Sequence, residues 1–225
     1  MTTARLVTLD RDGNVATLTL NRPESLNALT REMLDQACMA AREVAASDAR
    51  VLILTGAGRA FCAGVDLKIA RDRSYDAAAR AAFTHSALAF QHLVETMPQP
   101  VIAKIRGACV AGGLELALSA DCVIAATDAR FSDTHAKFGF IPEWGMPSRL
   151  AQLVGRMRAN DIAFTARVVD GIEAAAIGLV LEAVAPDLLD QRVTAFAAMI
   201  AANDPRSIAN YKTNIRQSVG DRVGI

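Results

Sequence analysis

The sequence predicts an α/β fold in one domain that ends in a helical segment. Short apolar runs typical of buried strands, at residues 51–55, 101–105 and 122–126, alternate with longer stretches in which apolar residues recur at helical spacing. Of the 225 residues, 52% are hydrophobic and 21% are charged, which is typical of a packed globular protein. We expect residues 1–187 to form the α/β core and residues 188–225 to form a helical C-terminal segment.

The first half of the chain has well-marked element boundaries. Residues 15–20 alternate in polarity after an Asp-Gly pair, which predicts a β-hairpin at the start. Apolar residues recur every three or four positions across residues 30–46, and Thr30 is the expected N-cap of that helix. The strand at 51–55 ends at a Gly-Ala-Gly turn, and residues 75–95 predict a long helix that a Met-Pro pair ends.

The second half continues the alternation of strands and helices. Residues 101–105 and 122–126 predict buried strands, and residues 180–184 predict a fourth. Residues 188–217 predict two helices that are broken near Asp204-Pro205.

Composition excludes several classes of protein. Lysine plus arginine equals aspartate plus glutamate at 24 each, which argues against a nucleic-acid-binding domain. The four cysteines form no Cys-x-x-Cys pair, and the three histidines form no His-Glu-x-x-His motif, so neither a disulfide framework nor a metal site is expected. The N-terminus has no apolar signal region, and no run reaches the ~18 apolar residues that a membrane span needs. We therefore expect a cytoplasmic protein with no membrane or nucleic-acid partner.

The first candidate site is a pair of glycines followed by an apolar run at residues 111–120. Gly112 and Gly113 are predicted to begin a buried helix, whose first backbone N–H groups have no partner within the helix. Glu115 is the single charged residue in this run, and burying an unpaired carboxylate is costly. Gly112 and Glu115 are three residues apart and lie on one helix face. Glu115 is either an ordinary first-turn acid that complements the helix dipole or an acid–base group in a site.

The second candidate site is the glycine-rich loop at residues 56–68, directly after a predicted strand. Such a loop can expose backbone N–H groups to an oxyanion. The third glycine of a dinucleotide-binding fingerprint is missing, and no helix of suitable length follows directly. The phosphate-binding loop of nucleotide hydrolases and the Gly-x-Ser-x-Gly elbow of serine esterases are both absent.

Four stretches spread over nearly the whole chain carry a combined signal. They are NRPESLNAL at 21–29, AFCAGVDLK at 60–68, GACVAGGLEL at 107–116, and ARF at 129–131 together with GFIP at 139–142. Together, and in this order, they resemble the crotonase family, the enoyl-CoA hydratase/isomerase superfamily. The resemblance implies a ββα-spiral core with a helical C-terminal segment, and assembly into homotrimers or dimers of trimers. It also implies an acyl-CoA thioester substrate and no cofactor, since coenzyme A is part of that substrate.

The same resemblance implies a role for specific backbone and side-chain groups. The thioester oxygen would be bound by the backbone N–H groups of Val65 and Gly112, because fixed donors stabilise negative charge as it develops. Arg22 and Lys68 would either meet the phosphates of coenzyme A or be plain surface cations, and the second interpretation is favoured. The residues expected along the coenzyme A path are Leu26, Ala63, Asp66, Leu67 and Lys68.

One departure from the family pattern concerns the proton carriers. Hydratases of this family use two glutamates; the first matches Glu115, whereas the second falls on His135. An imidazole exchanges protons near pH 7, so His135 is either a catalytic group or a hydrogen-bonded wall of the site. Asp133 would share a side with His135 in an extended segment and orient its ring, or else act as a turn or cap residue. Glu143 matches an active-site carboxylate of the aryl-CoA dehalogenase branch; the alternative is a solvent-facing residue after Pro142.

Hydration of a 2-enoyl-CoA to a 3-hydroxyacyl-CoA is therefore the leading functional hypothesis. Another reaction on the same thioester oxyanion, such as double-bond isomerisation, decarboxylation or C–C hydrolysis, is the second. A non-catalytic acyl-CoA-binding protein is the third, and it would bind CoA esters without any effect of Glu115 on a reaction.

Overall fold

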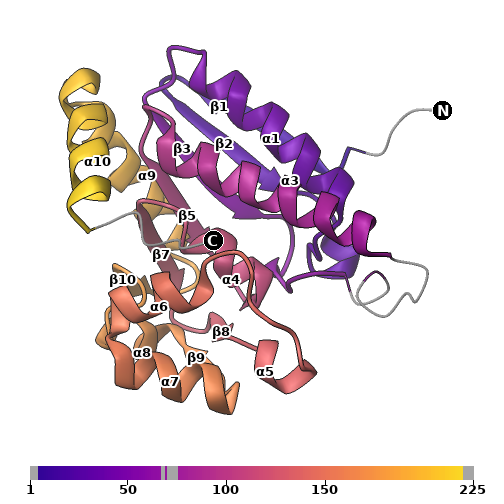
Figure 1. The fold of residues 1–225 in the computed structure, drawn as a ribbon. Coiled ribbons are helices and arrows are strands. Elements are labelled where there is room, and N and C mark those ends of the chain that lie inside the picture. The colour runs from indigo at the N-terminus through magenta and orange to yellow at the C-terminus, as the bar shows by residue number, and fades with distance from the viewer. Residues whose placement is uncertain (1–4, 67–68, 70–75, 220–225) are drawn as a thin grey trace.

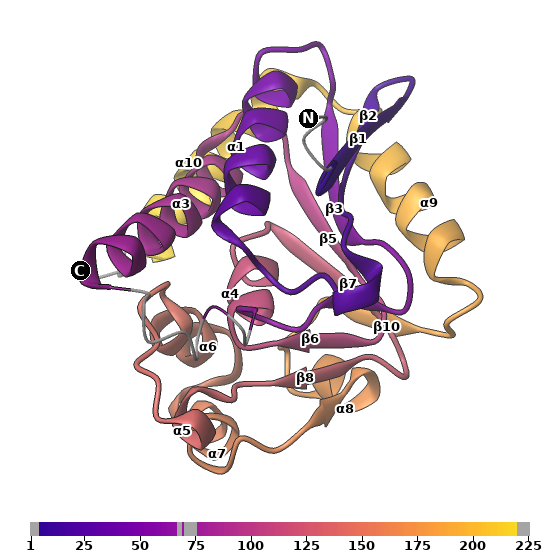
Figure 2. The ribbon, with the colours of Figure 1, turned by 90° about the vertical axis from the view of Figure 1, so that its right-hand side faces the viewer.

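Two sheets organise the computed structural model, which describes residues 5–66, 69 and 76–219 (Figure 1). In the described residues the larger sheet has the order β1-β2-β3-β5-β7-β10, where β1 and β2 form an antiparallel hairpin and the other neighbours pair in parallel. The smaller sheet has the order β4-β6-β8-β9, and its strands run across those of the larger sheet (Figure 2). The strands are β1 Val7–Asp12, β2 Val15–Leu20, β3 Val51–Gly56, β4 Ala60–Cys62, β5 Val101–Ile105, β6 Ala108–Val110, β7 Cys122–Ala126, β8 Arg130–Ser132, β9 Val169–Asp170 and β10 Glu182–Val184.

Helices cover both faces of the larger sheet. Helices α1 and α3 lie on one face and α9 lies on the other, whereas α5, α7 and α8 lie by the smaller sheet (Figure 2). The helices are η1 Pro23–Ser25, α1 Arg31–Ala45, α3 Ala77–Thr96, α4 Gly112–Ala117, α5 His135–Phe138, α6 Met146–Val154, α7 Arg156–Thr165, α8 Gly171–Ala176, α9 Leu189–Ala201 and α10 Pro205–Val219.

The apolar run of β3 shows why the larger sheet is covered on both sides. Successive side chains of a strand point to opposite faces. Leu52 and Leu54 enter the core cluster shared with α1 and α3, whereas Val51 and Ile53 enter the cluster shared with α9. A strand that is buried on both faces has a continuous apolar run in its sequence, and such a run predicted β3.

The predicted α/β fold is confirmed, and the predicted elements are found with small shifts of their ends. Thr30 is the N-cap of α1, and its hydroxyl accepts from the Met33 N–H at 3.2 Å. The long helix begins at Ala77 with Asp76 as its N-cap, whereas its expected start at Tyr75 lies outside the described residues. The break before Pro205 separates α9 from α10. The division between residues 1–187 and 188–225 stays a prediction.

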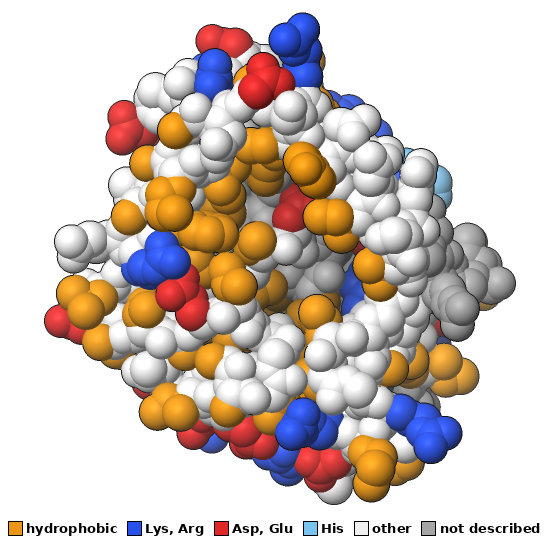
Figure 3. Space-filling model, turned by 90° about the vertical axis from the view of Figure 1, so that its left-hand side faces the viewer, with side chains coloured by type: hydrophobic (Ala, Val, Ile, Leu, Met, Phe, Trp, Pro, Cys, Tyr) orange, Lys and Arg blue, Asp and Glu red, His pale blue; other side chains and the backbone are white. Residues whose placement is uncertain are grey.

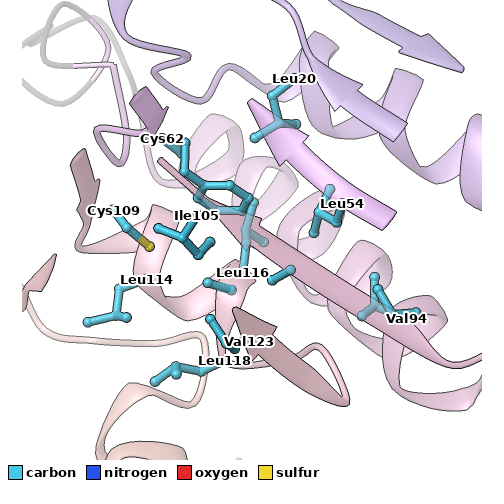
Figure 4. Close-up of a cluster of buried hydrophobic side chains, with 14 of the residues drawn as sticks. Leu20, Leu54, Cys62, Val94, Ile105, Cys109, Leu114, Leu116, Leu118 and Val123 are labelled. Atoms are coloured by element: carbon cyan, nitrogen blue, oxygen red, sulfur yellow. The ribbon is translucent and has the colours of Figure 1, made fainter. Parts of the chain in front are cut away.

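Helix α4 lies within the main hydrophobic core. Its apolar side chains, among them Leu114 and Leu116, are fully buried, and they pack with residues of β4, β5 and β6 (Figure 4). The free thiols of Cys62 and Cys109 are buried in the same cluster (Figure 4). The close-packed side chains around this short helix leave little room for movement, so α4 holds the backbone of Glu115 in a fixed position.

Candidate active site

The Glu115 carboxylate is buried at the inner end of a cavity. The residue is 1% exposed, and its Oε1 accepts from the backbone N–H groups of Trp144 and Met146, both at 3.2 Å. Burial raises the pKa of Glu115 to about 7, although the charge of His135 and the two N–H donors act in the opposite direction. A carboxyl group with a pKa near neutrality can both take and give a proton at physiological pH.

The two glycine-containing candidate segments are in contact at Gly64 and Gly112. Gly64 has a φ of +92°, and a Cβ there would lie 2.9 Å from the Val110 carbonyl oxygen and 3.5 Å from the Gly112 nitrogen. A Cβ on Gly112 would lie 2.7 Å from the Trp144 ring. The two segments can approach this closely because glycine has no side chain at either position. The close approach brings the backbone beside Val65 next to the start of α4.

The local backbone leaves the N–H groups of Val65 and Gly112 without a backbone acceptor among the described residues. The Leu29 N–H donates to the Gly64 carbonyl at 2.8 Å, and the Asp66 N–H donates to the Leu29 carbonyl at 3.0 Å. Both neighbours of Val65 thus face Leu29, so the Val65 N–H points the other way. Gly112 is the first residue of α4, where N–H groups have no intrahelical partner.

A strained residue sets the direction of the Gly112 peptide. Ala111, the residue before it, has φ 47° and ψ −119°, which is costly for a residue with a Cβ. Val65 and Gly112 line the same cavity as Glu115. Binding of one carbonyl oxygen by both N–H groups stays a prediction.

His135 and Asp133 form a hydrogen-bonded pair beside Glu115. The Nδ1 atom of His135 lies 2.6 Å from Asp133 Oδ1, and its Nε2 atom lies 3.7 Å from Glu115 Oε2. A carboxylate only accepts hydrogen bonds, so Nδ1 carries the proton and Nε2 faces Glu115. Burial by itself lowers the pKa of His135, but the hydrogen bond to Asp133 and the charges of Glu115 and Asp133 outweigh it and raise that pKa above its ordinary value.

Asp133 reaches His135 through a turn and not through an extended segment. Thr134 between them has φ −97° and ψ 7°, so the segment turns rather than extends. Asp133 Oδ1 also accepts from the His135 backbone N–H at 3.2 Å, as in a turn formed by an aspartate side chain. Asp133 therefore caps this turn and contacts the imidazole at the same time, which joins the two interpretations that the sequence left open.

A cavity of about 460 Å³ connects these groups. Its lining includes Glu143, an exposed residue whose Oε2 accepts from the Thr84 hydroxyl at 3.2 Å. The ring of Trp144 is buried and stacks on Phe83 with 5.4 Å between ring centroids, so Trp144 is both cavity wall and core. Glu115, His135 and Glu143 thus line one cavity.

The residues expected along the coenzyme A path stay a prediction. Ala63 lines the cavity, and its N–H donates to the Leu26 carbonyl at 3.0 Å. The Asp66 carboxylate is 3.1 Å from the Arg22 guanidinium, which also donates to the Ala28 carbonyl. Arg22 is therefore not the plain surface cation that was favoured, since its side chain is only 17% exposed. Leu67 and Lys68 lie outside the described residues.

Three groups around Glu115 were not found from the sequence. Trp144 and Met146 contribute backbone N–H groups, which carry no signal in a side-chain pattern. Arg149 on α6 donates to the Trp144 carbonyl, and it occupies the apolar face of that helix with Met146 and Leu150. A lone charge on an apolar helix face is the same signal that marked Glu115, so Arg149 could have been found.

The part of the chain that the structure describes contains no group of three or more histidine, cysteine, aspartate or glutamate side chains able to hold a metal ion. It also contains no helix that is long and apolar enough to cross a bilayer. His85 and His92 are exposed on α3, and all four cysteines are free.

Comparisons with known proteins identify the family. A family model described as enoyl-CoA hydratase/isomerase matches residues 10–223. A putative enoyl-CoA hydratase/isomerase of Bacillus subtilis is 38% identical over 215 residues, covering 93% of this chain and 80% of that protein. A short-chain-enoyl-CoA hydratase of Clostridium acetobutylicum is 34% identical, covering 95% and 82%.

Solved structures give the same result. The crystal structure of an enoyl-CoA hydratase from Bacillus anthracis matches with a TM-score of 0.89 and 33% identity, covering 93% of this chain and 82% of that one. The matches extend over both sheets and both candidate loops, so the resemblance drawn from four short motifs is confirmed. This chain belongs to the enoyl-CoA hydratase/isomerase family.

Proposed function

We propose that this chain adds water to the double bond of a 2-enoyl-CoA and forms a 3-hydroxyacyl-CoA. The observation that carries the proposal is the pairing of two acid–base groups in one cavity. Glu115 is buried with a pKa of about 7, and the Nε2 atom of His135 lies 3.7 Å from its Oε2. The same cavity is lined by Val65 and Gly112, whose N–H groups are the proposed thioester donors.

The thioester carbonyl is polarised first. The N–H groups of Val65 and Gly112 bind its oxygen, and negative charge moves onto that oxygen as water attacks the β-carbon. Because Gly112 is the first residue of α4, the helix dipole also stabilises the negative charge on the thioester oxygen. The loss of one such donor costs about 2.7–4 kcal/mol of transition-state stabilisation in comparable sites.

Two protons then move. Glu115 holds the water and takes one of its protons as the hydroxyl joins the β-carbon. His135, oriented by Asp133, is protonated on Nε2 at the start and gives that proton to the α-carbon of the enolate. The proton on Glu115 then passes to His135 Nε2, 3.7 Å from Glu115 Oε2, so that both groups are restored and one hydrogen and one hydroxyl are added overall. Glu143 is the alternative second proton carrier, because it lines the same cavity.

A panel of thioesters tests the proposal. The protein is incubated separately with 2-butenoyl-CoA, 3-butenoyl-CoA, butanoyl-CoA and benzoyl-CoA, and each product is followed by mass. Hydration adds the mass of one water to the first substrate only. Unchanged mass and unchanged double-bond position for every thioester, with tight binding retained, would identify a non-catalytic CoA-ester-binding protein instead.

Isomerisation of a 3-enoyl-CoA to a 2-enoyl-CoA is the second candidate. It needs one group that moves a proton between the α- and γ-carbons, and Glu115 alone meets that need. The observation in its favour is that a histidine occupies the position of the second glutamate. Conversion of 3-butenoyl-CoA to its isomer without water addition, detected by proton NMR, would favour this reaction over hydration.

The proposal extends to the surroundings of the site. Leu26, Ala63 and Asp66 are proposed to line the path of the coenzyme A part of the substrate. No further cofactor is needed, because acid–base groups and backbone donors supply the chemistry. Action in the cytoplasm fits the four free cysteines.

We also propose that the protein forms a homotrimer or a dimer of trimers. The face that carries α9 and α10 supports this, because hydrophobic side chains surround a hollow there (Figure 3). Met199, Tyr211 and Ile215 are each more than half exposed on these helices. Exposed apolar patches of this kind mark interfaces. Light scattering coupled to gel filtration tests the assembly, and a monomeric mass for the wild type would contradict it.

A further inference from the structure

The side chain of Arg149 holds the backbone segment that in turn holds Glu115. Arg149 lies on the buried face of α6, and the residue is 8% exposed. Its Nη1 atom donates to the Trp144 carbonyl at 2.5 Å. Its Nε and Nη2 atoms donate to Glu95 Oε1 on α3, at 3.0 and 2.5 Å. The rigid guanidinium fork therefore ties the 144–146 segment to a helix of the core.

The opposite side of that segment faces the catalytic carboxylate. The N–H groups of Trp144 and Met146 both donate to Glu115 Oε1 at 3.2 Å, which leaves Oε2 toward His135. The Trp144 ring also stacks on Phe83, another residue of α3. Two contacts with α3, one through Arg149 and Glu95 and one through the rings, thus define where the two N–H donors point.

We propose that Arg149 is a positioning residue for the reaction, which acts by holding the Trp144 and Met146 N–H groups against one oxygen of Glu115. Arg149 does not line the cavity that contains Glu115, so it acts through the backbone and not on the substrate. The inference rests on the proposed function insofar as Glu115 is the group that takes the proton from water. The structural part, in which Arg149 controls the environment of Glu115, does not depend on the reaction.

The charged side chains around Glu115 and Arg149 determine what a pH titration of Glu115 reports. His135 at the start of α5 and Asp133 just before it act on Glu115, and Glu143 and Arg80 line the same cavity. On the Arg149 side, Glu95 is the direct partner, and the neighbouring charged side chains are Asp121, Lys212 and Arg216. The two backbone donors favour the ionised carboxylate, so loosening them raises the pKa of Glu115 further.

The main variants are Arg149→Met, which removes the fork, and Arg149→Lys, which keeps a charge but loses the paired donors. The protonated carboxyl band of Glu115 is followed against pH by infrared difference spectroscopy, with Glu115→Gln to identify the band. The midpoint is expected to rise by about one pH unit in Arg149→Met and by less in Arg149→Lys. The acidic limb of kcat/KM for 2-butenoyl-CoA should move by the same amount, so that kcat at pH 7 falls while KM changes little.

Lys212→Met is the matched control, because Lys212 also forms a buried ion pair. Its side chain is 6% exposed, and its ammonium lies 2.8 Å from Asp121 and donates to the Val94 and Gln99 carbonyls. This variant is expected to lower the Tm without moving the Glu115 midpoint. A wild-type midpoint in both Arg149 variants, or an equal shift in Lys212→Met, would overturn the inference. Absence of hydration by the wild type would reject the proposed function alone, since the infrared titration still reports on Arg149.

Discussion

Replacing Glu115 with glutamine should abolish turnover and, at the same time, stabilise the folded protein at alkaline pH. The pKa of Glu115 is about 7 in the folded protein, against an ordinary value of 4.5. Below pH 4.5 the carboxyl is protonated whether the chain is folded or not, and folding carries no electrostatic cost. As the pH rises from 4.5 to 7, the folded protein keeps a proton that the unfolded chain has lost, and stability falls; above 7 both states are ionised and the loss is complete.

The size of this effect follows from the shift. A difference of about 2.5 pH units corresponds to about 3 kcal/mol once the pH exceeds 7, because one unit equals about 1.36 kcal/mol. Glutamine resembles the protonated carboxyl, and its side-chain oxygen can still accept from the Trp144 and Met146 N–H groups. Glu115→Gln should therefore increase the free energy of unfolding by about 3 kcal/mol at pH 8 but by less than about 1 kcal/mol at pH 5.

Urea unfolding at both pH values measures this difference. Trp144 is the only tryptophan and lies in the cavity wall, so its fluorescence reports on the relevant region. The protomer concentration is kept constant, because assembly changes apparent stability. Glu143→Gln is the control, since Glu143 is exposed on the same cavity and its replacement should change stability little at either pH.

The same variant is assayed for hydration of 2-butenoyl-CoA. Loss of an acid–base group typically lowers kcat by about 10²–10⁴-fold, whereas affinity for the CoA ester should stay near that of the wild type. Equal stability of the variant and the wild type at pH 8 would refute the high pKa. Wild-type turnover would refute the catalytic assignment of Glu115.

Four further substitutions examine the rest of the site. His135→Ala should remove the ionisation of the imidazole from the pH–rate profile and leave that of Glu115, and a profile that keeps both ionisations would show that His135 is only a wall residue. Asp133→Asn weakens the 2.6 Å hydrogen bond that raises the pKa of His135, so that pKa should fall, as NMR titration of the imidazole would detect; an unaltered titration would contradict the pairing. Gly112→Pro removes the proposed N–H donor and should lower kcat by about 10²–10³-fold. Gly112→Ala keeps the donor but crowds the Trp144 ring, so only a larger loss in the proline variant supports the oxyanion contact.

Local pattern was enough to predict most of the helices and strands. The apolar run at Val51–Gly56 and the helical spacing at Arg31–Ala45 each reflect a face that must be buried, and Thr30 satisfies an N–H group of the helix it precedes. Pro205 lacks an N–H donor and separates the last two helices for that reason. These effects act over a few residues, so the helices and strands that depend on them can be predicted from the sequence alone.

Local pattern also identified Glu115, because a lone carboxylate in an apolar helix is costly unless something compensates it. What compensates it could not be read from the sequence. The two N–H donors at Trp144 and Met146 are 29 and 31 residues away, and backbone donors look alike in every sequence. The turn at Thr134 was one of the two alternatives that the sequence left open for Asp133, but the residues alone could not show that the same carboxylate also contacts the imidazole.

The sequence by itself determined the α/β elements, the family and the identity of the buried acid, because each depends on short-range patterns or on motifs read in order. Only the tertiary structure decided which oxygen of Glu115 is held, which nitrogen of His135 faces it, and that Arg149 ties the intervening loop to α3. Those contacts join segments far apart in the chain. Their geometry depends on how the core packs as a whole, and that packing sets the pKa values on which the chemistry depends.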